Sequence, residues 1–262
     1  MSKHLFLAAS AAIALAASGQ AFAQSSIAQE DAAAARKAAD AKRVASLIEA
    51  EKKRPRVGGY WQLTAPVKAL MTVDGKAPPL TSAGRALYSK SVAGLKAKKS
   101  VDPMDICTPP GTPRAMVVDE PFMIAQTPAK ITFFYQIKHV IRHVYLDGPL
   151  KMGEDRDVLW EGHSSGRWEG DTLIIESGDF NGKQWIDNSG LPQSPDMRTV
   201  EKIRRVDANT LEDLITYTDA KYYSAPWTAR LTYRSLPAGT ILVEDDCAEK
   251  LLDFQMKPYA PE

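Results

Sequence analysis

The chain has 262 residues, of which 33 are Lys or Arg and 32 are Asp or Glu, so its net charge is close to zero. It lacks the surplus of one sign that draws nucleic acid or an anionic membrane surface to a protein. We therefore expect no nucleic-acid partner and no attraction to anionic lipid.

The first residues, 1–23, are predicted to be a cleavable signal peptide. Lys3 and His4 precede an apolar run, residues 5–17, that is shorter than a transmembrane helix needs. The run closes on Ala21-Phe22-Ala23, which puts small residues at the two positions a signal peptidase reads, so we expect cleavage after Ala23. The protein is thus predicted to act in the periplasm without membrane insertion. A retained N-terminal anchor is the alternative.

Residues 24–56 are predicted to form an Ala-rich helical arm. Alanine and charged residues favour a helix there, but few large apolar side chains are available to pack it. Pro55 and Gly58-Gly59 are expected to end the arm, and residues 57–262 are expected to form a single β-barrel domain. The arm is a candidate surface for a homodimer or for a partner helix.

The two cysteines, Cys107 and Cys247, lie far apart in the sequence. In an exported protein such a pair is expected to form a disulfide, because the compartment is oxidising. It would join an irregular stretch to the last predicted strand. Two buried free thiols are the alternative.

From Pro121 onward, short runs rich in β-branched and aromatic residues alternate with turn signals. The turns are too short for crossover helices, so neighbouring strands are expected to pair antiparallel. An up-and-down barrel would leave no exposed edge strands, and a sandwich is the alternative. The fold class predicted is therefore mainly β. The predicted strands are 122–126, 131–136, 140–146, 158–168, 172–177, 199–206, 211–218, 227–236 and 241–247.

Strand alternation predicts which side chains face the barrel interior. His143 shares parity with Ile141 and Tyr145, so an inward Ile141 would bring the imidazole and the phenol inward and turn Arg142 outward. On later strands Glu201 and Asp213 are predicted to be inward carboxylates, and Arg198 has the opposite parity to Glu201.

Apart from His4, the histidines are His139, His143 and His163, and all of them lie in or beside predicted strands. This clustering makes them candidates for acid–base chemistry, although each could equally be a hydrogen-bonded structural residue. There is no His-Glu-x-x-His run, so no metal is expected. A nucleotide-binding glycine pattern is also missing from the sequence, and no cofactor is expected.

A polar loop between Asp179 and Arg198 is longer than a hairpin requires. Trp185 is a candidate lid over an apolar cavity, with Asp187 as a carboxylate beside it. The alternative is that Trp185 only anchors the loop.

Several segments together resemble one protein family. Residues 162–173 read GHSSGRWEGDTL, and residues 107–114 and 145–148 read CTPPGTPR and YLDG. These stretches are similar to a large, mostly uncharacterised family of exported bacterial proteins. The resemblance implies a lipocalin-like barrel and no agreed activity, and some family members occur in bacteria that degrade plant aromatic dimers.

The family pattern is only partly present. His163, Trp185, Asp187 and Glu201 match the family. Leu150, Gln193 and Arg198 stand where the family carries histidines, which makes a shared metal site less plausible.

These observations lead to two hypotheses. The first is a cofactor-independent lyase or isomerase that transfers protons on an apolar, aromatic substrate, such as a phenylcoumaran-type lignin dimer. The second is a non-catalytic periplasmic carrier of a hydrophobic small molecule. For the first, the candidate residues are His143 or His163 as base, Tyr135 or Tyr145 as acid, Glu201 or Asp187 as orienting carboxylate, and Arg142, Arg198, His139, Trp185 and Asn181 as substrate-binding groups.

Overall fold

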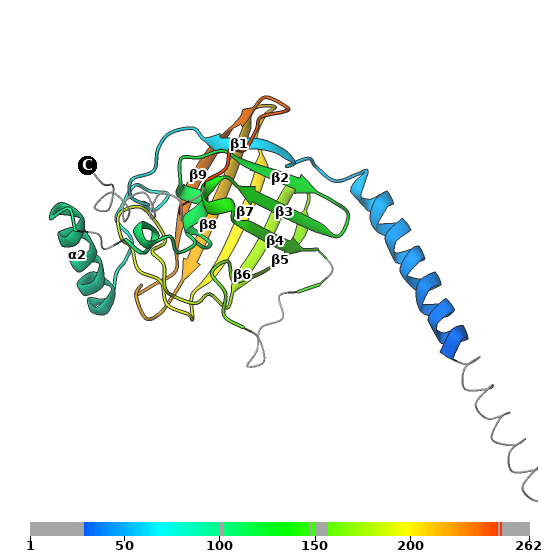
Figure 1. Ribbon diagram of the computed structural model, residues 1–262, viewed down its shortest axis with the longest axis horizontal. Coiled ribbons are helices and arrows are strands. Elements are labelled where there is room, and N and C mark those ends of the chain that lie inside the picture. The colour runs from blue at the N-terminus through cyan, green and yellow to red at the C-terminus, as the bar shows by residue number, and fades with distance from the viewer. Residues whose placement is uncertain (1–28, 100–101, 147, 150–156, 246, 248–262) are drawn as a thin grey trace, which may run out of the picture. The chain divides into compact units, whose positions relative to one another are not determined.

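The computed structural model describes residues 29–99, 102–146, 148–149, 157–245 and 247 (Figure 1). The predicted signal peptide and its cleavage site lie outside the described residues. The chain divides into two units, residues 1–53 and 54–262, which we describe separately. Within the part of the chain that is described, no helix is both long and apolar enough to cross a membrane.

The first unit contains one helix, residues 29–51, whose side chains are almost all exposed. Its composition explains this, because alanine favours the helical backbone but offers little surface to bury. The predicted N-terminal helix is therefore confirmed.

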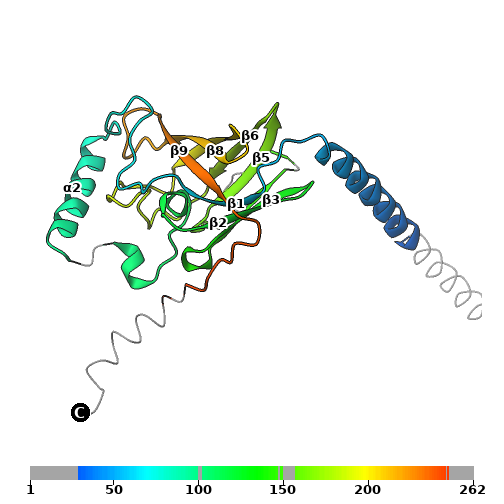
Figure 2. The ribbon, with the colours of Figure 1, turned by 90° about the horizontal axis from the view of Figure 1, so that it is seen from above.

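The second unit is a closed barrel whose strands follow one another in chain order, which confirms the predicted fold class (Figures 1 and 2). The strands over residues 198–205, 210–218 and 227–236 bury every second residue, as a wall with one interior face requires, whereas those over 130–135, 163–169 and 172–178 each bury three consecutive residues. The strands are β1 Gly59–Leu63, β2 Phe122–Gln126, β3 Lys130–Tyr135, β4 Ile141–Tyr145, β5 His163–Glu169, β6 Thr172–Gly178, β7 Arg198–Arg205, β8 Thr210–Thr218 and β9 Trp227–Leu236.

The barrel closes through β1 rather than through the C-terminal stretch. β1 pairs antiparallel with both β2 and β9 and buries Trp61 and Leu63. The predicted strand 241–247 was wrong, because residues 241–245 form no strand and leave Ile241 and Val243 exposed. Because β1 already pairs with β9 and closes the barrel, no free strand edge is left there with which the C-terminal stretch could pair.

The predicted disulfide is confirmed. Cys107 and Cys247 are joined by a 2.04 Å Sγ–Sγ bond. Cys107 caps the short helix η1 Pro103–Ile106, and Cys247 lies beyond the last strand instead of within one.

One strand pair departs from the predicted antiparallel order. β4 and β5 run parallel and pair only at Val144 with Ser164 and at Tyr145 with Ser165. A parallel pair needs a connection that returns the chain to the same end of the sheet. The chain between Tyr145 and His163 is long enough to do so, and it leaves a weakly paired seam in the barrel wall.

Besides η1 and η3 Ile137–His139, the described part of the barrel unit contains two further helical elements. α2 Ser82–Lys96 lies outside the barrel (Figures 1 and 2), and Thr81 caps its N-terminus, because the Thr81 Oγ1 accepts a hydrogen bond from the Gly84 amide. η2 Arg114–Val117 is buried. Its Met116 carbonyl accepts a hydrogen bond from the Tyr233 hydroxyl, so η2 contacts the barrel interior.

Candidate functional site

A cleft of about 390 Å³ lies over the β4–β5 seam. One wall comes from the outward positions of β4, and the other comes from the segment that leads into β5. Apolar and aromatic side chains share this lining with four titratable groups, of which one is the phenol of Tyr145. The lining residues are Ile141, His143, Tyr145, Leu159, Trp160, Glu161, Gly162, His163 and Ser164.

Glu161 is the carboxyl of the cleft lining, and its pKa is shifted well away from its ordinary value. Its Oε2 accepts a hydrogen bond of 2.7 Å from the Thr112 hydroxyl, and its Oε1 is buried with no hydrogen-bond partner among the described residues. Burial raises the pKa of Glu161 to about 7, although the Thr112 bond and the Arg142 charge act in the opposite direction. The carboxyl therefore exchanges its proton near neutral pH.

His143 lines the same cleft with its ring largely exposed. Its Nδ1 lies 3.3 Å from the Thr132 hydroxyl, and its Nε2 makes no hydrogen bond to any described residue. Partial burial and the charge of Lys130 lower the pKa of His143. The imidazole is thus neutral at neutral pH and can accept a proton.

The second histidine of the cleft, His163, begins β5. Its Nε2 lies 3.0 Å from the Asp157 carbonyl oxygen. Because a carbonyl oxygen can only accept, Nε2 carries a proton in this contact.

The predicted orientation of β4 was wrong. Arg142 and Val144 are the buried positions, while Ile141, His143 and Tyr145 are exposed. The Arg142 guanidinium faces inward because it pairs with a buried carboxylate, and strand alternation then turns its neighbours outward. His143 and Tyr145 consequently face the cleft and not the barrel interior.

Behind the cleft, Arg142 forms a buried ion pair with Glu201. Its Nη1 and Nη2 lie 2.9 Å and 2.5 Å from the two carboxylate oxygens. Nε and Nη2 also donate to the hydroxyls of Ser164 and Ser177, which are hydrogen-bonded to each other. Ser164 also lines the cleft, so this polar cluster directly backs the cleft wall. The predicted inward position of Glu201 is confirmed by its burial.

Other interior polar groups lie around this ion pair. Tyr135 and Asp213 are both buried, as predicted for Asp213. Burial raises the pKa of Tyr135, so its phenol stays protonated at neutral pH. Burial and the Glu201 charge raise the pKa of Asp213. Neither oxygen of Asp213 has a hydrogen-bond partner among the residues described, and the same holds for the hydroxyls of Tyr217 and Thr199.

Asp187 lies away from the cleft and organises the polar loop. Its carboxylate accepts from the amides of Leu70, Ser189, Gly190 and Leu191. These bonds use its acceptor capacity within the loop, so its contacts are structural.

The other predicted binding residues also lie away from the cleft lining. Trp185 is buried with the Arg114 guanidinium 5.3 Å from its ring centroid, which favours the anchoring interpretation over a lid. Asn181 accepts from the Lys183 amide. Arg198 donates to the carbonyl of its neighbour Met197, and His139 Nε2 accepts from the amide of Asp245.

Glu161 was not predicted from the sequence. Its only local signal is its place directly before Gly162-His163, and its burial depends on residues near Thr112, far away in the sequence. Among the described residues, no group of three or more His, Cys, Asp or Glu side chains could hold a metal ion.

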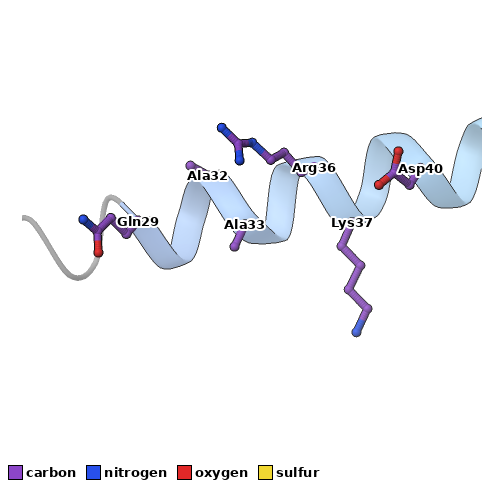
Figure 3. Close-up of a pocket in the computed structure, with 6 residues that line it drawn as sticks. All are labelled: Gln29, Ala32, Ala33, Arg36, Lys37 and Asp40. Carbon is purple, nitrogen blue, oxygen red and sulfur yellow. The ribbon is translucent and has the colours of Figure 1, made fainter. Parts of the chain in front are cut away.

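A second hollow lies along helix 29–51 (Figure 3). Its lining residues are all exposed and all belong to this one helix, so no opposing wall could enclose a ligand. They are Gln29, Ala32, Ala33, Arg36, Lys37 and Asp40.

No known protein-family model matches the chain, and no curated protein matches it significantly. The family resemblance remains a prediction, and the function is inferred from the geometry of the site.

Proposed function

We propose that the protein is an exported, cofactor-independent lyase or isomerase that transfers protons on an apolar, aromatic substrate in the β4–β5 cleft. The observation that carries this proposal is Glu161, a partly buried carboxyl in the wall of a partly apolar cleft, whose buried Oε1 has no hydrogen-bond partner among the described residues and whose pKa is raised by burial to about 7. A group that titrates near the working pH is suited to general acid–base catalysis.

Two cleft residues supply complementary roles. Burial keeps a large fraction of Glu161 protonated at neutral pH, so it can donate a proton. His143 has a lowered pKa and is neutral, so it can accept one. A pair of groups whose environments shift their pKa values in opposite directions is the usual arrangement for an acid and a base in one site.

The cleft lining indicates the substrate class. Trp160, Tyr145, Leu159 and Ile141 offer aromatic and apolar surface, and the last three are substantially exposed there. Opening of a phenylcoumaran-type ring is a concrete example. His143 would remove a proton from carbon, the electron pair would form a carbon–carbon double bond, and the ring carbon–oxygen bond would break as Glu161 protonates the departing oxygen. This elimination is redox-neutral.

The periplasm is the proposed location. The N-terminal sequence carries the features of a signal peptide, and a disulfide is compatible with an oxidising compartment.

The test is to incubate the purified mature protein with a panel of aromatic dimers, without added cofactor, and to analyse the products. Glu161→Gln should reduce turnover by about 100-fold or more, the usual contribution of a general acid. Glu212→Gln, which alters a partly exposed carboxylate on the outer face of β8, is the matched control and should leave turnover unchanged. Full activity of Glu161→Gln would refute the proposed role of Glu161.

The second candidate function is non-catalytic carriage of a small molecule in the barrel interior. Polar side-chain atoms of Asp213, Tyr217 and Thr199 are buried without a hydrogen-bond partner among the described residues, which favours this function, since buried polar groups usually have partners. Stacking of Tyr217 on Trp227 adds aromatic surface. Binding of several panel members without turnover, weakened by Asp213→Asn but not by Glu161→Gln, would support carriage over catalysis.

A further inference from the structure

We propose that Thr112 is a positioning residue for the cleft, and that residues 107–113 form a clamp, anchored by the disulfide, that holds Glu161 in the cleft wall. This inference deepens the proposed function and rests on Glu161 being the acid–base group. We call residues 107–113 the clamp.

Thr112 contacts Trp160 and Glu161, the two cleft residues directly before Gly162. Its hydroxyl donates to Glu161 Oε2 at 2.7 Å, and its amide donates to the Trp160 carbonyl at 3.3 Å. Thr112 is completely buried, so water does not compete for these bonds. The hydroxyl bond is also the only hydrogen bond that the described residues make to the Glu161 carboxyl.

The clamp can approach the cleft segment because the residue directly before Thr112 is a glycine. Gly111 has a φ of +66°, and a Cβ atom there would lie 2.5 Å from the Trp160 carbonyl oxygen. Any other residue would be strained by this φ and would push the clamp away from Trp160. The contact between the two segments is therefore encoded at Gly111 and Thr112 together.

The clamp is itself held from several sides. Cys107 is bonded to Cys247, and Lys138 Nζ donates to the Thr108 carbonyl at 3.2 Å. The Gln184 side-chain amide donates to the Thr108 hydroxyl and to the Pro109 carbonyl. These contacts come from distant parts of the chain, so the position of the Thr112 hydroxyl does not depend on the cleft itself.

The bond from Thr112 also influences the pKa of Glu161. The Thr112 hydroxyl can donate to the carboxylate, which favours the ionised form and opposes the effect of burial on the pKa. Removing the hydroxyl should leave the carboxyl buried with no donor, and Glu161 should then hold its proton to higher pH.

The experiment is a pH titration of the Glu161 side-chain carboxyl by ¹³C NMR, on the mature protein without substrate. Glu161→Gln identifies the signal by removing it. Thr112→Val should raise the titration midpoint by about one pH unit, equivalent to a tenfold increase in proton affinity. Thr112→Ser, which keeps the hydroxyl, should restore the midpoint to near the wild-type value.

Thr228→Val is the matched control, because it removes a threonine hydroxyl bonded to Thr216 on the β8–β9 wall. It should leave the midpoint unchanged. If Thr112→Val fails to fold by circular dichroism, Thr112→Ala makes the same test with a smaller side chain. An unchanged midpoint in the folded variant, or no restoration by Thr112→Ser, would overturn the inference.

The titration does not depend on turnover, so its failure can be told apart from failure of the proposed function. If a substrate is turned over, the pH profile of kcat should move in the same direction as the NMR midpoint. A structural role for Thr112 alone would lower the stability without moving either midpoint.

Discussion

The buried ion pair of Arg142 and Glu201 allows a sharp test of how the interior of this barrel is held together. Both side chains are 1 % exposed, and the guanidinium makes two hydrogen bonds to the carboxylate. Glu201→Gln preserves the shape but leaves the Arg142 charge without its counter-ion. Breaking a buried pair on one side typically costs about 3–5 kcal/mol, because the remaining charge stays desolvated.

The assay is urea unfolding followed by far-UV circular dichroism at neutral pH. The matched control is Glu212→Gln, which disrupts solvent-accessible pairs with Arg204 at 3.4 Å and with Arg230 at 3.3 Å on the two adjacent strands. Because solvent screens exposed pairs, this control should cost about 1 kcal/mol or less. The free energy of unfolding should therefore separate the two variants clearly.

A double variant, Arg142→Met with Glu201→Leu, completes the test. Replacing both charges with apolar groups removes the desolvation cost as well as the attraction, so the stability should return to near the wild-type value. Ser164 and Ser177 would still bond to each other. The reasoning is refuted if Glu201→Gln costs no more than Glu212→Gln, or if the double variant is as unstable as the single one.

Three further predictions concern stability. The pKa of Glu161 is raised from 4.5 to about 7 in the folded state, so the folded protein binds more protons than the unfolded chain between these values and loses stability as the pH rises. Glu161→Gln should remove this loss, and the stability difference from wild type, measured by urea unfolding at several pH values, should grow between pH 4.5 and 7; a constant difference would contradict it. Replacing Cys107 and Cys247 with serine should lower the free energy of unfolding by about 2–5 kcal/mol, whereas adding reductant to that variant should change nothing. Asp187→Ala should lower the melting temperature by leaving several buried loop amides unpartnered, while turnover per folded molecule stays unchanged; selective loss of kcat would instead restore Asp187 as a catalytic candidate.

The amino-acid sequence determined the barrel and much of its inner surface. Alternation along 211–218 and 227–236 predicted two neighbouring strands and the inward position of Asp213. Glu201 was placed correctly for the same reason. Such predictions succeed because the side-chain period of a strand is local and one buried face repeats every second residue.

The tertiary structure decided what local patterns left ambiguous. The inward side chains of β4 were assigned from the apolar Ile141. In the structure Arg142 faces inward and Ile141 outward, because the Arg142 charge pairs with Glu201 on β7. Likewise, no residue near Glu161 in the sequence indicates that Thr112 forms a hydrogen bond with its carboxyl. The burial of a charge and the pKa of a carboxyl depend on groups brought together from distant parts of the chain, and only folding brings them together.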